Sequence, residues 1–205
     1  MAEFDRDYWE QHWDPTRSRS KHQMPVNPYL PAQTAHLRPG TALDAGCGTG
    51  AEAIWLAENG WQVTAADISR RALETARTRA ATTDAGRPID WVEADLSRWQ
   101  PGRTWDLVVT NYAHPAIGQL PFYRRIAAWV APGGTLLIVG HLHAHQHGDH
   151  HTHPENASVT SEAVTGLFDA QSWRIVTAYE HTRTVHHGGA EVHLRDMIVR
   201  ARRTA

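Results

Sequence analysis

The chain of 205 residues is long enough for one ordinary domain with a full core, and we expect a single domain over residues 1–205. Its 41% hydrophobic and 20% charged residues exclude a disordered chain, and a net charge of −2 argues against a nucleic-acid partner. Residues 1–10 lack the apolar segment of a secretion signal, and no apolar run reaches membrane-spanning length. We therefore expect a cytoplasmic monomer or homodimer with no membrane partner.

The N-terminal segment, residues 1–26, is predicted to lie outside the core. Residues 4–14 favour a short helix, on which Trp9 and Trp13 lie about one turn apart and share a face. Packing against the body of the protein is the simplest explanation of such an aromatic face. Asn27 followed by Pro28 is typical of a helix start, which predicts a helix over residues 28–37.

A strand, a glycine-rich turn and a helix follow. Thr41–Ala45 is typical of a buried strand, Gly46, Gly48 and Gly50 come next, and residues 51–59 favour a helix that stops before Gly60. Glycine lets the backbone adopt a positive φ and lets a ligand approach closely, while the helix start offers free N–H groups. This pattern predicts the nucleotide-binding start of an α/β unit, with G-x-G-x-G spacing in place of the G-x-G-x-x-G of pyrophosphate binders.

The next predicted strand, residues 61–66, leads into an acid, Asp67. An acid about 20 residues beyond the glycine turn suits the two hydroxyls of a ribose. With this acid, the sequence LDAGCGTG at residues 43–50 resembles the class I S-adenosylmethionine (SAM) methyltransferases. The longer stretch 27–69 resembles the small bacterial enzymes near the tellurite-resistance and thiopurine methyltransferases. The similarity covers residues 8–140 well and the remainder in outline.

The resemblance implies a fold, a cofactor and a set of site residues. The fold would be α/β, with a doubly wound, Rossmann-like sheet of seven strands, mostly parallel, that ends in an antiparallel hairpin. SAM would be the cofactor, a small molecule the partner, and residues 1–26 a cap over the cofactor pocket. The residues implied to contact the cofactor are Asp44, Gly46, Cys47, Gly48, Gly50, Asp67, Ile68, Asp95, Leu96, Asn111 and Trp13.

Asp95 has two interpretations. It follows the third predicted strand, residues 89–93, where an acid in this family commonly faces the adenine amino group, and a carboxylate can accept from that N–H. The alternative is an aspartate that shapes a turn.

The other elements follow from the hydrophobic pattern and the helix-breaking residues. Ser69 is expected to cap a helix that ends at Ala80, with Leu73 and Ala76 facing inward. Residues 105–110 form the fourth strand, and residues 111–115 after it should face the transferred methyl group. We further expect helices over residues 121–130 and 160–170, a tight turn at 132–134, and strands over 135–140, 172–181 and 191–200.

Seven histidines fall within thirteen residues, from His141 to His153, in a predicted loop over residues 141–158. They could line the acceptor pocket, where a neutral imidazole accepts a proton, with His141 and His143 as candidate bases. They could instead bind a divalent metal, with His143, His145, His147 and His150 as candidate ligands, although the spacing matches no known zinc motif. The third interpretation is a solvated loop.

Two further residues complete the candidate site. His114, in the turn after the fourth strand, is a third candidate catalytic residue, and a structural histidine bonded to the backbone explains it equally well. Cys47 is the only cysteine and fits a small packing residue, because methyl transfer from SAM needs no covalent enzyme intermediate. The resulting hypothesis is a SAM-dependent methyltransferase that acts on a small molecule. The alternative is a metal-binding or regulatory protein that uses residues 141–153 on a SAM-binding scaffold.

Overall fold

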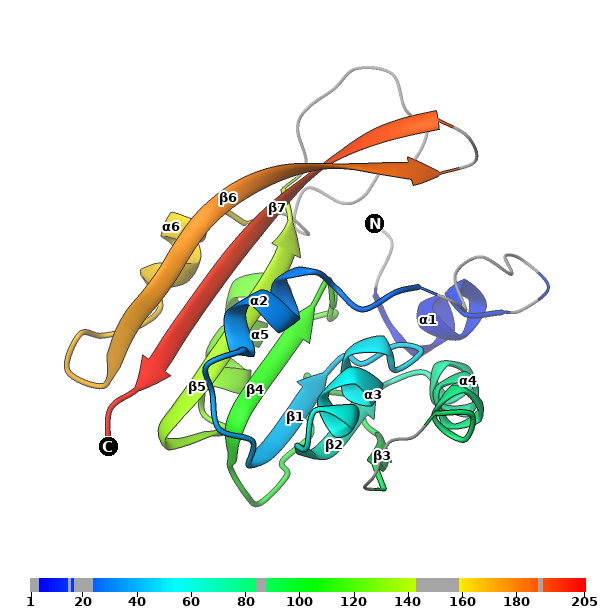
Figure 1. The fold of residues 1–205 in the computed structure, drawn as a ribbon, viewed down its shortest axis with the longest axis horizontal. Coiled ribbons are helices and arrows are strands. Elements are labelled where there is room, and N and C mark those ends of the chain that lie inside the picture. The colour runs from blue at the N-terminus through cyan, green and yellow to red at the C-terminus, as the bar shows by residue number, and fades with distance from the viewer. Residues whose placement is uncertain (1–3, 15, 17–23, 84–87, 143–158, 188–189) are drawn as a thin grey trace.

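The computed structural model describes residues 4–14, 16, 24–83, 88–142, 159–187 and 190–205. One mixed sheet of seven strands has the order β3-β2-β1-β4-β5-β7-β6 (Figure 1). Strands β1 to β5 run parallel, whereas β7 is antiparallel to β5 and to β6, so the predicted seven-stranded architecture is confirmed. The strands are β1 (Thr41–Ala45), β2 (Gln62–Asp67), β3 (Asp90–Glu93), β4 (Trp105–Asn111), β5 (Val130–His141), β6 (Trp173–His187) and β7 (Ala190–Arg203). The helices are α1 (Arg6–His12), α2 (Tyr29–Thr34), α3 (Ala51–Glu58), α4 (Arg70–Ala80), α5 (Gln119–Ala127) and α6 (Ser161–Thr165).

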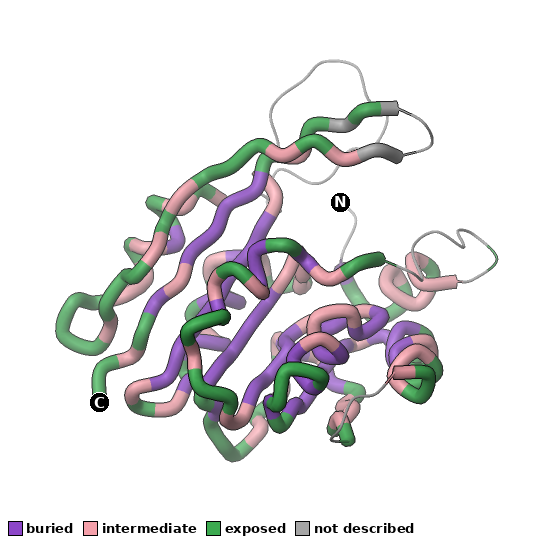
Figure 2. The backbone as a smooth tube through the Cα atoms, in the orientation of Figure 1, coloured by how far each residue is buried: buried purple, intermediate pink, exposed green. Residues whose placement is uncertain are grey.

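Helices cover both faces of the sheet. α2 and α3 lie in front of it and α5 and α6 behind it in Figure 1, and each face carries its own apolar core. Leu137 and Val139 of β5 point into the front core, whereas Leu136 and Ile138 point into the rear core, as expected for a strand buried on both faces. Burial is concentrated in the central strands and falls off along β6, the edge strand (Figure 2). No side chain that the structure describes on β6 is buried.

The first half of the chain folds as its local signals predict. Ser69 caps α4 by accepting a hydrogen bond from the Ala72 N–H at 3.2 Å, and Leu73 and Ala76 are fully buried. Helix α3, after the glycine turn, ends at Glu58, one residue sooner than predicted. Asn59 caps it, and Gly60 follows with a φ of +86°.

Several predicted boundaries were wrong. Helix α5 starts earlier than expected and ends at Ala127, and Val130 already belongs to β5, where it pairs with Trp105. The predicted tight turn at 132–134 lies inside β5, where the register shifts between Trp105 and Leu107 and Gly133 has a positive φ of +75°.

The short helices end sooner, and the last strands extend further, than the sequence indicates. Helix α6 ends before Gly166, and Asp169 then forms a turn by accepting from the N–H groups of Gln171 and Ser172 at 3.1 and 2.8 Å. Helices α1 and α2 likewise cover less than residues 4–14 and 28–37. Strands β6 and β7 are longer because they pair along their whole length, past the end of β5.

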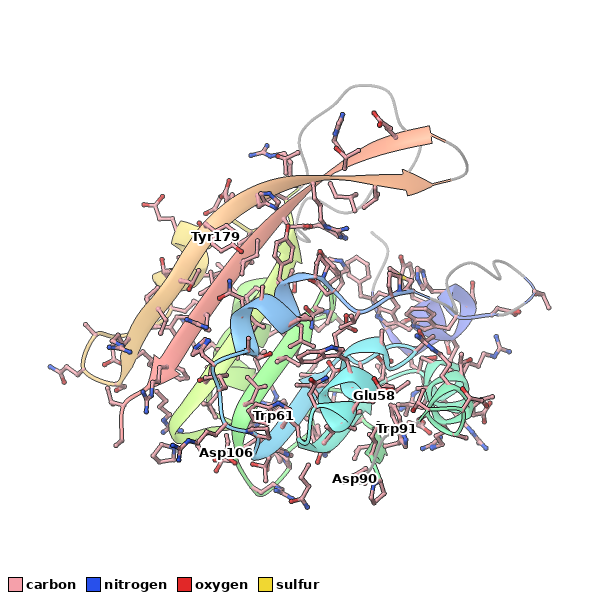
Figure 3. All side chains as sticks on the ribbon, in the orientation of Figure 1. Glu58, Trp61, Asp90, Trp91, Asp106 and Tyr179 are labelled. Carbon is pink, nitrogen blue, oxygen red and sulfur yellow. The ribbon has the colours of Figure 1, made fainter. Side chains whose placement is uncertain are left out.

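The parallel strands bring their carboxyl ends to one edge of the sheet. Asp67 ends β2, Asn111 ends β4 and His141 ends β5. Trp61 and Asp106, labelled in Figure 3, lie at the opposite edge. In the described part of the chain no helix has the length and apolar character needed to cross a membrane. The single domain, the cytoplasmic location and the oligomeric state stay predictions.

Candidate functional site

The glycine turn after β1 is held against the end of β2. The N–H groups of Gly46 and Cys47 both donate to the Ala66 carbonyl oxygen, at 2.8 and 3.1 Å. Gly46 has a φ of +82°, and a Cβ built on it would lie only 2.5 Å from the Cβ of Ala113, in the segment after β4. The turn therefore brings the ends of β1, β2 and β4 into contact, and a side chain at position 46 would separate them.

Asp67 connects two loops of this edge. It is 8% exposed, and its Oδ2 accepts from the Gly48 N–H at 2.8 Å while its Oδ1 accepts from the Ser69 N–H at 2.9 Å. Burial raises the pKa of Asp67, although these two hydrogen bonds act in the opposite direction. Each carboxylate oxygen has a second lone pair, so Asp67 can accept further hydrogen bonds from a ligand. Ile68, the next residue, is half-buried.

Two polar side chains near the ends of the neighbouring strands β1 and β4 carry buried atoms that lack a partner among the described residues. One is Oδ2 of Asp44, a residue that is 1% exposed, and the others are Nδ2 and Oδ1 of Asn111. Burial, followed by the charges of Glu52 and Asp67, raises the pKa of Asp44 well above its ordinary value. Unsatisfied buried polar atoms are costly, so Asp44 and Asn111 are candidates for contact with a ligand.

Helix α1 covers the glycine turn. A Cβ on Gly48 would lie 3.1 Å from the indole ring of Trp13, which places this ring directly over the turn. Glu10 connects the helix to α4: its Oε1 accepts from the Arg70 N–H at 2.6 Å, and its carbonyl oxygen accepts from Arg71 Nη1 at 3.0 Å. These contacts show that α1 packs on the body of the protein, whereas its role as a cap over a cofactor pocket stays a prediction.

Asp95 makes the contacts of a residue that forms a turn. Its Oδ1 accepts from the Ser97 N–H at 2.9 Å, and its carbonyl oxygen accepts from the N–H groups of Arg98 and Trp99 at 2.9 and 2.7 Å. These contacts agree with the turn interpretation, and the half-buried carboxylate keeps lone pairs for a ligand, so its contact to adenine stays a prediction. Leu96 is buried in the rear core.

His114 and Cys47 have the surroundings of structural residues. Nδ1 of His114 lies 2.8 Å from Nε2 of Gln119, which donates to it, and Phe4 stacks on the ring at a centroid distance of 5.4 Å. Cys47 is buried, and burial raises the pKa of its thiol well above the ordinary value, which disfavours the nucleophilic thiolate. A catalytic role of His114 stays a prediction.

A polar cluster that the sequence analysis missed surrounds His141. Its Nδ1 lies 3.1 Å from Oδ1 of Asp196 on β7, and its ring stacks on Tyr112 at a centroid distance of 3.8 Å. Asp196 has no exposed surface, and its Oδ2 also accepts from the Tyr29 hydroxyl at 3.0 Å and from Arg183 Nε at 2.6 Å. Burial acts to raise the pKa of Asp196, but the hydrogen bonds of His141 and Arg183 outweigh it and lower this pKa to about 2.

Tyr112 adopts a strained backbone conformation next to Asn111. Its φ of +55° is the only positive φ outside glycine among the residues that the structure describes. A left-handed conformation is unfavourable for an aromatic residue, and such strain is concentrated at functional sites. Its hydroxyl accepts from Arg183 Nη2 at 3.2 Å, which links Tyr112 to the same polar cluster.

The metal hypothesis falls on residues outside the described part of the chain. His143, His145, His147 and His150 all belong to the undescribed segment 143–158. Within the described ranges, no group of three or more histidine, cysteine, aspartate or glutamate side chains could hold a metal ion. The candidate ligands, and His143 as a base, stay predictions.

One surface hollow lies away from these residues. It has a volume of about 580 Å³ and is lined by Arg103, Arg124 and Trp129, on the α5 side near the start of β4. It contains none of the candidate site residues, so it does not identify the site. At the carboxyl edge of the sheet, Trp13 lies against the glycine turn.

Comparisons with known proteins agree with this geometry. Residues 42–134 match a family model described as a methyltransferase domain. A trans-aconitate 2-methyltransferase of Streptomyces coelicolor is 35% identical over 115 residues, which cover 54% of this chain and 36% of that protein. A thiopurine S-methyltransferase of Pseudomonas entomophila is 32% identical over 99 residues, which cover 45% of each protein.

A solved structure extends the likeness to the whole fold. The 1,6-didemethyltoxoflavin-N1-methyltransferase of Burkholderia thailandensis, with bound 1,6-didemethyltoxoflavin and S-adenosylhomocysteine, superposes with a TM-score of 0.66. The superposition covers 98% of this chain and 87% of that one at 21% identity, so it establishes the fold. The two sequence relatives are matched over less than half of their own length.

Proposed function

The chain carries a class I SAM-dependent methyltransferase domain, and we propose that it transfers the methyl group of SAM to a small-molecule acceptor. The family and the fold that the glycine turn and the acid after β2 imply are thereby confirmed. The small-molecule acceptor is supported by the two sequence relatives, which are named for trans-aconitate and for thiopurine. These two names differ in chemistry, so they leave the acceptor atom of this chain open.

The observation that carries the proposal is the set of buried, unpartnered polar atoms of Asp44 and Asn111 beside the glycine turn. SAM has an ammonium and a sulfonium group, both cationic, together with a carboxylate. The buried carboxyl of Asp44, whose Oδ2 lacks a partner, gains a compensating positive charge when a cation binds beside it. The residues present therefore fit SAM better than they fit an anionic nucleotide.

Each remaining residue has a role that its contacts allow. Asp67 would accept from the ribose hydroxyls, beside the glycine turn that leads into α3. Asp95 would accept from the adenine amino group, with Ile68 and Leu96 as apolar neighbours, and Trp13 would cover the pocket. SAM supplies a methyl group that its sulfonium already activates, so the protein has to exclude water, align the acceptor and remove a proton where the acceptor carries one.

The alternative function is a metal-binding or regulatory protein that acts through residues 141–153. The complete glycine turn and the buried Asp67 do not favour a degenerate scaffold. Metal content and SAM affinity measured on the same preparation separate the two functions. Metal at full occupancy without SAM binding would establish the alternative.

We expect SAM binding to release protons at pH values above the ordinary pKa of an aspartate. The raised pKa of Asp44 means that the free folded protein keeps this carboxyl protonated at pH values where an exposed aspartate is ionised. A cation beside Asp44 favours the ionised form, so binding lowers this pKa and releases protons between the two values. SAM affinity should therefore rise with pH through this window. Titration calorimetry in buffers of different ionisation enthalpy measures the proton count.

The matched variants for this experiment are Asp44→Asn and Asp90→Asn. Asn cannot titrate, so Asp44→Asn should abolish most of the released protons and weaken SAM binding. Asp90 is exposed on β3, so Asp90→Asn should leave the number of released protons and the SAM affinity unchanged. Proton release of equal size in all three proteins would assign it to another group and contradict the role of Asp44.

We also expect the cofactor to stabilise α1. Trp13 lies on the glycine turn, but the ion pairs that connect Glu10 to Arg71 and Asp14 to Arg71 are partly exposed, and such pairs contribute only about 0–1 kcal/mol. Amide hydrogen exchange in residues 4–14 should therefore slow when S-adenosylhomocysteine is added, and Trp13→Ala should remove most of this protection. Unchanged exchange would leave α1 as ordinary packing.

A further inference from the structure

We propose that Asp196 is a positioning residue that fixes His141 with Nδ1 protonated and Nε2 as the proton acceptor, so that the methyl acceptor is a molecule that loses an O–H or N–H proton. This inference rests on the proposed methyl transfer and deepens it by naming the chemical class of the acceptor. It follows from the polar cluster of His141, Asp196, Tyr112, Arg183 and Tyr29, whose contacts determine the protonation of the imidazole.

The carboxylate of Asp196 determines which nitrogen of His141 carries the hydrogen. An ionised carboxylate only accepts hydrogen bonds, so the nitrogen 3.1 Å from Oδ1, which is Nδ1, must be the donor. A neutral imidazole has one hydrogen, and the lone pair is then on Nε2. The pKa of Asp196, at about 2, keeps the carboxylate ionised at neutral pH.

Further groups hold the carboxylate in place. Oδ2 accepts from Arg183 Nε at 2.6 Å and from the Tyr29 hydroxyl at 3.0 Å. Nδ1 of His181 lies 2.8 Å from the Tyr29 oxygen, and because the Tyr29 hydroxyl donates to Asp196, His181 donates to Tyr29. The positive charge of Arg183 compensates the buried carboxylate, so Asp196 orients His141 without depending on an imidazolium partner.

The ring of His141 is held on its face as well as on its edge. Tyr112 stacks against it with an angle of 13° between the rings, and Arg183 Nη2 donates to the Tyr112 hydroxyl. The strained φ of Tyr112 brings its ring to this position immediately after Asn111. One carboxylate, one guanidinium and one aromatic ring therefore fix the direction of Nε2.

The cluster lies at the same edge of the sheet as the candidate SAM site. Asn111 pairs with Val139, two residues before His141, and His141 pairs with Asp196. A base here is needed only for an acceptor that is protonated at neutral pH. The acceptor's O–H or N–H proton moves to Nε2, its lone pair forms the new bond to carbon, and the electron pair of the S–CH₃ bond stays on sulfur. A thiolate or a metalloid oxyanion is already nucleophilic and needs no such step.

The first test is the tautomer of His141 in the intact chain. Uniformly ¹⁵N-histidine-labelled protein with saturating S-adenosylhomocysteine is examined by long-range ¹H–¹⁵N NMR, and His141→Gln assigns the signal. We expect a protonated Nδ1 and an unprotonated Nε2 in the wild type, and loss of this preference in Asp196→Asn. The matched control is Glu180→Gln on the same hairpin, where the carboxylate pairs with Arg195, and it should leave the signal unchanged. A protonated Nε2 in the neutral wild-type imidazole would overturn the proposal.

The second test separates the acceptor classes. Transfer of tritiated methyl from SAM is measured with phenol, aniline, thiophenol and tellurite. Methylation of phenol or aniline that falls about 100-fold or more in Asp196→Asn and His141→Gln supports the proposal. Methylation of thiophenol or tellurite at the wild-type rate in both variants overturns it. Where no compound in the panel is methylated, the tautomer of His141 from the first test alone supports or overturns the proposal.

Failure of the methyltransferase function and failure of the role of Asp196 give different experimental results. In Asp196→Asn, affinity for S-adenosylhomocysteine should stay within about threefold of the wild type, because the hydrogen bonds described for Asp196 join it to His141, Arg183 and Tyr29 rather than to the glycine turn or Asp67. Absence of S-adenosylhomocysteine binding in the wild type would contradict the proposed function. Normal binding together with the other tautomer would contradict only the role of Asp196.

Discussion

Replacement of Asp67 by alanine should lower SAM affinity by about 10²–10⁴-fold. The carboxylate is expected to accept hydrogen bonds from the ribose hydroxyls, and hydrogen bonds to a charged group are worth about 1.5–3 kcal/mol each. Two such bonds amount to about 3–6 kcal/mol, and each 1.4 kcal/mol is about tenfold in affinity. Calorimetry with SAM and with S-adenosylhomocysteine measures the change.

The control for this prediction is Asp106→Ala. Asp106 accepts from the N–H and the hydroxyl of Thr41, both at 2.8 Å, at the opposite edge of the sheet. Like Asp67, it holds two loops or strands together, so both variants lose structural hydrogen bonds, but only Asp67 faces the proposed cofactor. Urea unfolding shows whether each protein remains folded. SAM affinity that is equal in Asp67→Ala and Asp106→Ala would contradict the ribose contact.

Replacement of Gly46 by alanine should destabilise the protein by about 2–5 kcal/mol and remove measurable SAM binding. A φ of +82° costs an L-residue about 1–2 kcal/mol, and the new Cβ would lie 2.5 Å from the Cβ of Ala113, an overlap that adds about 1–3 kcal/mol. Relief of the overlap moves the segment after β4, and Asn111 with it. Urea unfolding gives the loss of stability, and calorimetry gives the loss of affinity.

Gly102→Ala separates backbone strain from overlap. Gly102 has a φ of +67°, but a Cβ on it would have no atom within 4 Å. This variant should be less stable than the wild type only by the backbone strain of about 1–2 kcal/mol, and it should bind SAM normally. If Gly46→Ala were no less stable than Gly102→Ala and bound SAM equally well, the close contact between the glycine turn and the β4 end would not matter for the site.

The sequence predicted the elements whose signals are local. The cap at Ser69, the glycine turn and the stop at Gly60 each depend on one residue and its neighbours, and the structure confirms all three. The boundary between α5 and β5 depends on a distant partner, because Val130 becomes a strand residue by pairing with Trp105. Helix propensity alone could not reveal this pairing.

The polar cluster at His141 shows the same limit within the site. His141 attracted attention through the histidine-rich segment. Its partner Asp196 lies on β7, and the other groups bonded to Asp196, Arg183 and Tyr29, come from β6 and α2. Their meeting depends on the register of β7 against β5, which pairs His141 with Asp196. The available signal was a single aspartate beside the apolar residues Met197 and Ile198 of a strand, where an unpaired carboxylate is too costly to bury.

Calorimetric titration of the intact wild-type chain with SAM tests the central claim most directly. We predict binding in the micromolar range that S-adenosylhomocysteine competes for and that Asp67→Ala weakens. A folded wild-type protein, verified by circular dichroism in the same buffer, that shows no SAM binding would contradict the methyltransferase function.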